Sequence, residues 1–128
     1  MNIARILVAF CLVTLAAWAS AGTIKPYDQA AFDQLAAEGK PIVLSVRAPW
    51  CPTCKKQDPI QSELMKRPAY SDYTLFTIDF DSQKDLLKKY KVGMQSTMVV
   101  FHGKDEVGRS VGDTKEESID ALMKKAHS

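Results

Sequence analysis

The chain has 128 residues, of which 46% are hydrophobic and 25% are charged, and its formal net charge is +2 at pH 7. This length accommodates one domain, and the ordinary composition excludes a wholly disordered, collagen-like or coiled-coil chain. The small net charge provides no strong field for nucleic acid or an anionic membrane. Three cysteines are too few for a disulfide-built miniprotein or for a four-cysteine zinc site.

The N-terminus has the three parts of a secretory signal. Residues 1–21 carry one base and no acid, residues 6–18 are almost wholly apolar, and small residues at 19–21 fit a signal peptidase site. The apolar run of about 13 residues is shorter than the ~20 that cross a bilayer. We therefore predict a cleaved signal peptide over 1–21 and one exported domain over 22–128. A retained signal anchor and a lipoprotein are the alternatives.

The first half of the mature chain predicts a helix, a strand and a second helix. Asp28 is typical of an N-cap, and apolar residues follow it at helical spacing. Residues 42–46 form an apolar run with strand character. The second helix should begin just after Cys51 and extend to about Lys66, and Pro59 should kink it by removing one backbone hydrogen bond.

The second half predicts two further strands, a hairpin and two helices. Residues 74–80 and 97–101 read as strands, and 106–111 as the hairpin partner of the latter. Ser82 with Asp85 resembles a capping box for the helix between these strands.

The last helix should start with a second capping box, formed by Asp113 and Glu116, and bury one apolar stripe. A small strand near residues 23–25 completes the pattern. Strands separated by helices predict an α/β fold with right-handed parallel crossovers, and the hairpin adds an antiparallel edge.

Chemistry is concentrated at a C-x-x-C sequence where a buried strand passes into a helix. The sulfur of Cys51 should meet unpaired backbone N–H groups and the positive end of the helix dipole, which favour thiolate over thiol. Cys54 lies one turn later on the same face and can close a disulfide. We expect Cys51 to be the more exposed and more acidic thiol, and Cys54 to lie deeper. Such a pair can cycle between dithiol and disulfide by exchange with a substrate.

Other readings of this pair stay open. A static disulfide across so short a loop would stabilise the fold only weakly. A metal site would need further ligands, and His102 and His127 are distant in sequence. The C-x-x-C pattern could also be coincidental, although its position between strand and helix makes it much more specific.

The sequence around these cysteines resembles the thioredoxin family. Residues 48–55 read Ala-Pro-Trp-Cys-Pro-Thr-Cys-Lys, similar to the family's A-x-W-C-x-x-C-K, and Pro59 matches the proline of its active-site helix. The similarity extends over residues 27–126. It implies a thioredoxin fold, with a mixed central sheet of four to five strands flanked by helices, and disulfide oxidoreductase activity. Together with its predicted secretion signal, the sequence resembles periplasmic members of the family.

The resemblance also implies roles for individual residues. Cys51 would be the attacking nucleophile and Cys54 the resolving thiol, with Trp50 on the substrate-facing rim. The substrate-binding residues expected by this match are Trp50, Pro52, Thr53, Gln95, Ser96 and Thr97.

Three positions depart from the family pattern. Ser45 stands where the family has a buried acid, and Thr77 where a lysine often pairs with that acid. Ser96 replaces the family's cis-proline beside the cysteines. A cis bond before serine costs about 3–4 kcal/mol, so we expect Gln95–Ser96 to be trans and Ser96 to lie close to Cys51 and Cys54. Loss of this proline also supports the metal alternative.

The sequence therefore predicts a periplasmic thiol–disulfide oxidoreductase that exchanges disulfides with cysteine pairs of other proteins. It should be a monomer without a cofactor, should receive or donate electrons through a redox partner protein, and should not bind nucleic acid. Its membrane contact would be transient, through the signal peptide. The alternative is a protein that binds a soft metal, copper or zinc, on Cys51 and Cys54. Reductant, oxidant and isomerase all remain open, because the reduction potential decides the direction.

Overall fold

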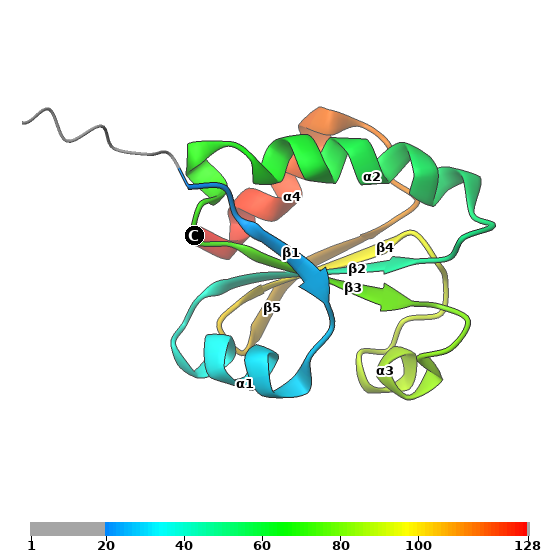
Figure 1. Ribbon diagram of the computed structural model, residues 1–128, viewed down its shortest axis with the longest axis horizontal. Helices are drawn as coiled ribbons and strands as arrows, with labels where there is room; N and C mark the ends of the chain where they lie inside the picture. The colour runs from blue at the N-terminus through cyan, green and yellow to red at the C-terminus, as the bar shows by residue number, and fades with distance from the viewer. Residues whose placement is uncertain (1–19, 128) are drawn as a thin grey trace, which may run out of the picture.

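The computed structural model describes residues 20–127, which form a five-stranded sheet between two layers of helices (Figure 1). In chain order the elements are β1 (Thr23–Pro26), α1 (Gln29–Ala37), β2 (Pro41–Arg47), α2 (Pro52–Met65), η1 (Pro68–Tyr70), β3 (Thr74–Asp79), α3 (Lys84–Lys89), β4 (Thr97–His102), β5 (Asp105–Val111), α4 (Glu116–Lys124) and η2 (Lys125–His127). The predicted fold class and order of elements are confirmed, including the small first strand.

The strand order is β1-β3-β2-β4-β5, with β2 at the centre of the sheet. β1, β3 and β2 are parallel, so the predicted pairing of residues 42–46 with 74–80 is confirmed. β4 runs antiparallel to β2, and β5 antiparallel to β4. The end of β2 therefore lies beside the start of β4 and the end of β5, because Thr97 pairs with both Val46 and Val111.

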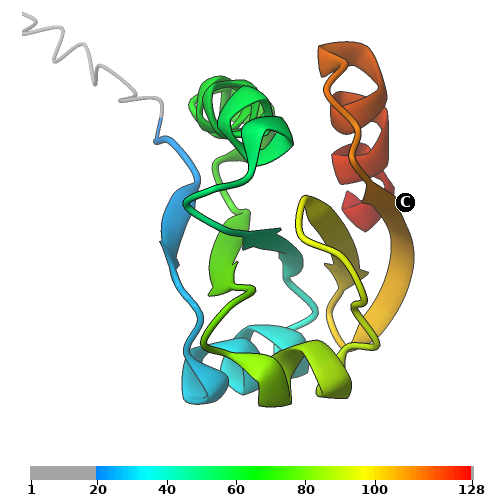
Figure 2. The ribbon, with the colours of Figure 1, turned by 90° about the vertical axis from the view of Figure 1, so that its right-hand side faces the viewer.

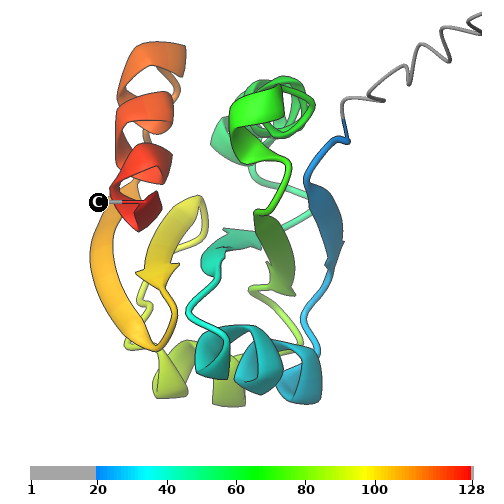
Figure 3. The same ribbon diagram turned by 90° about the vertical axis from the view of Figure 1, so that its left-hand side faces the viewer.

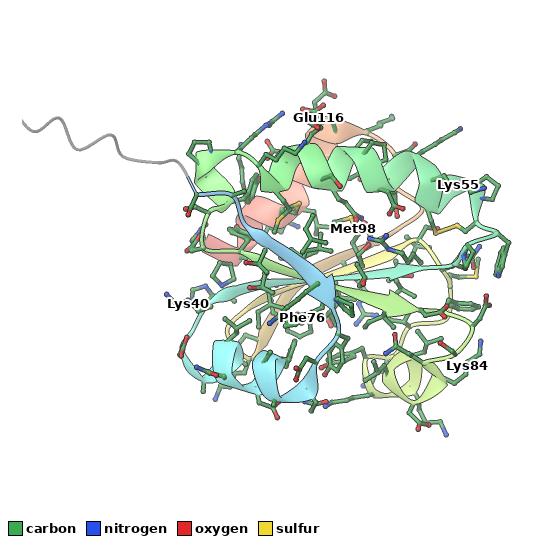
Figure 4. The ribbon with its side chains drawn as sticks, in the orientation of Figure 1. Lys40, Lys55, Phe76, Lys84, Met98 and Glu116 are labelled. Atoms are coloured by element: carbon green, nitrogen blue, oxygen red, sulfur yellow. A yellow bond between two sulfur atoms is a disulfide. The ribbon has the colours of Figure 1, made fainter. Side chains whose placement is uncertain are left out.

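Each face of the sheet buries its own apolar core. The helices α2 and α4 cover one face, and α1 and α3 cover the other (Figures 2 and 3). Met98 points toward α2 and α4, where it packs with Leu64 and Met123, while Phe76 points to the opposite face and packs with Phe32 (Figure 4). Because both faces are covered, the central strands are apolar runs without the alternation of a half-exposed sheet.

Both predicted capping boxes are wrong. α3 has Gln83 at its cap position, because the Ser82 hydroxyl donates to the Asp79 carboxylate at 2.7 Å instead of accepting from the helix. α4 has Lys115 at its cap position, because the Asp113 carboxylate accepts from the backbone N–H of Lys115 at 3.0 Å, within the preceding turn. Short polar side chains can bond several nearby backbone groups, and the chain path selects among them.

The predicted signal peptide lies outside the described residues except for Ser20 and Ala21. Between residues 20 and 127, no helix is long and apolar enough to cross a membrane.

Candidate active site

The cysteine pair lies where β2 gives way to α2. The backbone N–H of Cys51 donates to the Ala48 carbonyl at 3.1 Å, which turns the chain into the helix. Cys51 is the N-cap of α2, Pro52 occupies the first turn, and the Cys51 Sγ accepts the backbone N–H of Cys54 at 3.1 Å. This sulfur therefore occupies the place of a capping oxygen, where helix N–H groups and the dipole favour negative charge.

A disulfide joins Cys51 to Cys54, with their Cα atoms 5.3 Å apart. Cys51 is 1% exposed and Cys54 is 2% exposed, and both pack with Ala48 and Phe80. The prediction that Cys51 is the more exposed thiol is wrong for this disulfide form. The reason is local. The Cys51 side chain caps the first turn of α2, and its sulfur is therefore buried against the same residues as that of Cys54.

Apolar side chains stand exposed at this end of the sheet. Trp50 is 55% exposed, lies edge-on to Phe80, and donates its indole N–H to the Asp81 carboxylate at 2.8 Å. Met94 precedes β4 and Val111 ends β5, and both are more than half exposed. Trp50 is thus exposed beside the cysteines, and its predicted place on a substrate-facing rim stays a prediction. Pro52 is exposed and Thr53 half-buried.

The loop that carries Ser96 is fixed by backbone contacts to the elements around the cysteines. The Ser96 N–H donates to the Val46 carbonyl at 2.8 Å. Its carbonyl accepts from the Gly112 N–H at 3.0 Å and from the Gln57 Nε2 at 3.1 Å. The bond before Ser96 is trans, as expected, because residues 20–127 contain no cis peptide bond. Ser96 itself has φ of 56°, a left-handed conformation that costs a non-glycine residue about 1 kcal/mol or more.

The two residues that flank Ser96, Gln95 and Thr97, have partly or fully buried side chains. Gln95 is half-buried, and its carbonyl accepts from the Ser96 hydroxyl at 2.7 Å. Thr97 is buried, and its hydroxyl donates to the Met94 carbonyl at 2.6 Å. Contact of these residues with substrate, like that of Pro52 and Thr53, stays a prediction.

No ionisable group occupies the position of the family's buried acid. Ser45 is buried, lies beside Thr77 on β3, and donates its hydroxyl to the Gln61 Oε1 at 2.9 Å. The Gln61 Nε2 is buried and has no hydrogen-bond partner. Neither Gln61 nor Gln57 is predicted from the sequence to be part of the site, because glutamine on a helix is usually solvent-facing. Their spacing from Cys54 was the available signal, since residues three, four and seven apart share one helix face.

A cavity of about 440 Å³ opens beside Cys54, between α2 and the ends of β2 and β3. Cys54, Arg47, Lys55, Asp58 and Asp79 are among the residues that line it. Arg47 and Asp58 form an ion pair across it at 3.4 Å. The cavity therefore connects a buried sulfur to charged groups at the surface.

The sequence profile of the thioredoxin family matches residues 23–125, which is most of the chain. The chain belongs to the thioredoxin family. The solved structure of Trxlp from Edwardsiella tarda EIB202 is 37% identical, with a TM-score of 0.77, and the match covers 79% of this chain and 98% of that one. An H-type thioredoxin of Fagopyrum esculentum is 35% identical over 88 residues, or 69% of this chain and 74% of the relative. One from Brassica campestris is 34% identical over 85 residues, or 66% and 68%.

Family membership and the closed cysteine pair together make this chain a thioredoxin-like thiol–disulfide oxidoreductase. Between residues 20 and 127, no three His, Cys, Asp or Glu side chains are grouped so that they could hold a metal ion. The two sulfurs of the pair can exchange a disulfide through a mixed-disulfide intermediate.

Proposed function

We propose that the protein is exported to a bacterial periplasm and exchanges disulfides with cysteine pairs of other proteins through Cys51 and Cys54. The roles of the two cysteines are inferred from the hydrogen bond that the Cys54 N–H donates to the Cys51 Sγ at the helix N-terminus. The same N–H groups would stabilise a Cys51 thiolate in the reduced protein, which makes Cys51 the attacking sulfur.

The reaction balances without a cofactor. The Cys51 thiolate attacks a substrate disulfide, forms a mixed disulfide and releases one substrate thiolate. Cys54 then attacks the Cys51 sulfur, which closes the Cys51–Cys54 disulfide and releases the second thiolate. The substrate is reduced by two electrons and the protein is oxidised by two. A redox partner protein returns the electrons, or the cycle runs in reverse as a substrate oxidant, according to the reduction potentials.

Substrate proteins would approach over the exposed apolar rim of Trp50, Met94 and Val111. Such a rim suits an unfolded or extended segment, because apolar area contributes affinity with little demand on sequence. The protein would act as a monomer, which leaves this end of the sheet open to partners.

Trapping by cysteine variants tests the assignment. Cys54→Ser should accumulate covalent complexes with substrate proteins, because the mixed disulfide cannot be resolved, whereas Cys51→Ser should trap few. Non-reducing gel electrophoresis after acid quenching gives the readout, and wild type should reduce insulin under the same conditions. Trapping by the Cys51 variant alone would reverse the roles. A metal that survives dialysis against chelator, with no insulin reduction, would favour the soft-metal alternative.

Export is tested separately, by fractionation of bacterial cells that express the full chain. The mature protein should appear in the periplasmic fraction and begin at Gly22 on N-terminal sequencing. A cytoplasmic protein that keeps residues 1–21 would contradict the proposal.

A further inference from the structure

Resolution of the mixed disulfide requires Cys54 to lose its proton. Cys54 is 2% exposed, and a thiol in apolar surroundings gives up its proton reluctantly. None of the buried polar side chains titrates near neutral pH; they are Ser45, Gln57, Gln61, Thr74, Ser96 and Thr97. The cavity offers the proton a route out, because Cys54 lines it together with charged side chains that reach the surface.

Two carboxylates line that cavity, those of Asp58 and Asp79. Asp79 accepts hydrogen bonds from the Ser82 hydroxyl and the Asp81 N–H. Both bonds lower the pKa of Asp79, and the bond from Ser82 has the larger effect. Asp79 thus holds a proton poorly. The Asp58 carboxylate has one described partner, the Arg47 guanidinium at 3.4 Å.

Asp58 also has the right place on the helix. It follows Cys54 by four residues, so the two side chains share one face of α2 and line the same cavity. The volume of about 440 Å³ is ample for several waters, each of which needs ~30 Å³. The other charged groups that face Asp58 in this cavity are Arg47 from β2, Lys55 from α2 and Asp79 from β3.

We propose that Asp58 takes up the Cys54 proton through water in this cavity during resolution, in place of the acid that Ser45 replaces. The S–H bond of Cys54 breaks, the proton moves through water to the Asp58 carboxylate, and the Cys54 thiolate forms the S–S bond with Cys51 as the substrate thiolate leaves. Asp58 then returns the proton to solvent. Arg47 is a positioning residue that holds the carboxylate at the cavity wall. This inference rests on the proposed roles of Cys51 and Cys54.

The test separates the two chemical steps in the full mature protein. Reduced protein is mixed in stopped flow with one equivalent of an aromatic disulfide that liberates a coloured nitrothiobenzoate anion at each step. The first phase reports attack by Cys51 and the second reports resolution by Cys54. Asp58→Asn should slow the second phase at least roughly tenfold, leave the first phase unchanged, and shift the second-phase pH profile toward alkaline pH.

Three further variants keep the test decisive. Glu63→Gln makes the same change at an exposed carboxylate of α2 and should behave as wild type. Arg47→Gln removes the positioning contact but keeps the carboxylate, so its second phase should slow by less than that of Asp58→Asn, and Asp58→Glu should restore most of the rate. A second phase unchanged in Asp58→Asn, or slowed equally in Arg47→Gln, would overturn the proposal. Release of one equivalent only by wild type would refute the resolving role of Cys54 and this inference with it.

Discussion

Ser96 is held in a left-handed conformation by hydrogen bonds on both sides of its Cα atom. Its N–H is committed to the Val46 carbonyl, and its carbonyl accepts from both Gly112 and Gln57. Three hydrogen bonds, with β2, α2 and the bend after β5, outweigh a local cost of about 1 kcal/mol. The loop next to the cysteines is therefore shaped by its surroundings and not by the preference of its own residue.

Proline at this position, although typical of the family, should be harmful in this chain. Ser96→Pro would remove the N–H that Val46 accepts and impose φ near −65°, against the observed 56°. We expect a loss of about 3 kcal/mol of unfolding free energy, measured by urea denaturation. Ser96→Gly, which accepts positive φ freely, should be at least as stable as wild type. A proline variant of wild-type stability would show that the loop can rearrange to a different backbone.

At the scale of elements, one side chain connects the redox helix to two loops. Gln57 is buried on α2, and its Nε2 donates to the Ser96 carbonyl at 3.1 Å and to the Asp113 carbonyl at 2.8 Å. Ser96 precedes β4 and Asp113 precedes α4, so this amide joins three parts of the chain that are far apart in sequence. The cysteine-bearing turn of α2 and the Ser96 loop thus keep a fixed spacing.

Gln57→Leu should weaken this connection while preserving side-chain volume. It leaves the Asp113 carbonyl without its Gln57 donor, and we expect a loss of about 1–3 kcal/mol of unfolding free energy in urea. Gln34→Leu is the matched control, because Gln34 is exposed on α1 and bonds only to Glu38 among its described partners, so its effect should lie within about 0.5 kcal/mol. Equal effects of the two variants would contradict the connecting role of Gln57.

At the scale of the whole molecule, we expect buried tyrosines to limit stability at alkaline pH. Tyr73 donates its hydroxyl to the Met123 carbonyl, and Tyr70 bonds to Asp120, so both fasten α4 to the chain before β3. Burial raises the pKa of Tyr73 to about 12 and also raises that of Tyr70 above its usual value. Both groups are neutral in the fold at pH values where the unfolded chain already ionises.

The sign of the pH dependence follows from these raised pKa values. The stabilisation is complete below the unfolded pKa near 10 and is lost as pH rises toward the folded values. The midpoint of thermal unfolding should therefore fall by several degrees between pH 10 and 12, measured by circular dichroism after brief incubation. Tyr73→Phe should be less stable at neutral pH, for want of one hydrogen bond, but should show a shallower alkaline decline. A parallel decline in both proteins would exclude Tyr73 as a cause.

The sequence predicts the elements well where one local signal decides them. The strands at residues 42–46 and 74–80 follow from apolar runs, and the Asp28 N-cap is confirmed by its bond to the Ala31 N–H at 3.1 Å. Ser82 and Asp113 fail as caps because each has a competing partner nearby in the chain. A pattern of residue types cannot rank such partners.

The candidate site also has features that the local sequence predicts and features that it does not. The place of the cysteines at the start of α2 follows from the local pattern. The left-handed backbone of Ser96 and the burial of Gln57 and Gln61 depend on contacts with residues distant in sequence. The exposure of Cys51 was predicted wrongly because helix position alone does not specify what covers a side chain.

The attachment of β1 would also constrain the order of events in the proposed export. Gly22 donates its N–H to the Met65 carbonyl and Thr23 to the Tyr73 carbonyl, and a Cβ atom at Gly22 would lie only 2.5 Å from the Tyr70 carbonyl oxygen. The predicted cleavage point thus abuts chain that is tightly seated in the finished fold. A protease needs free, extended residues on both sides of the bond it cuts. Cleavage of the leader would then have to precede the docking of β1 into the sheet. A precursor that folds before it is cleaved would keep its leader.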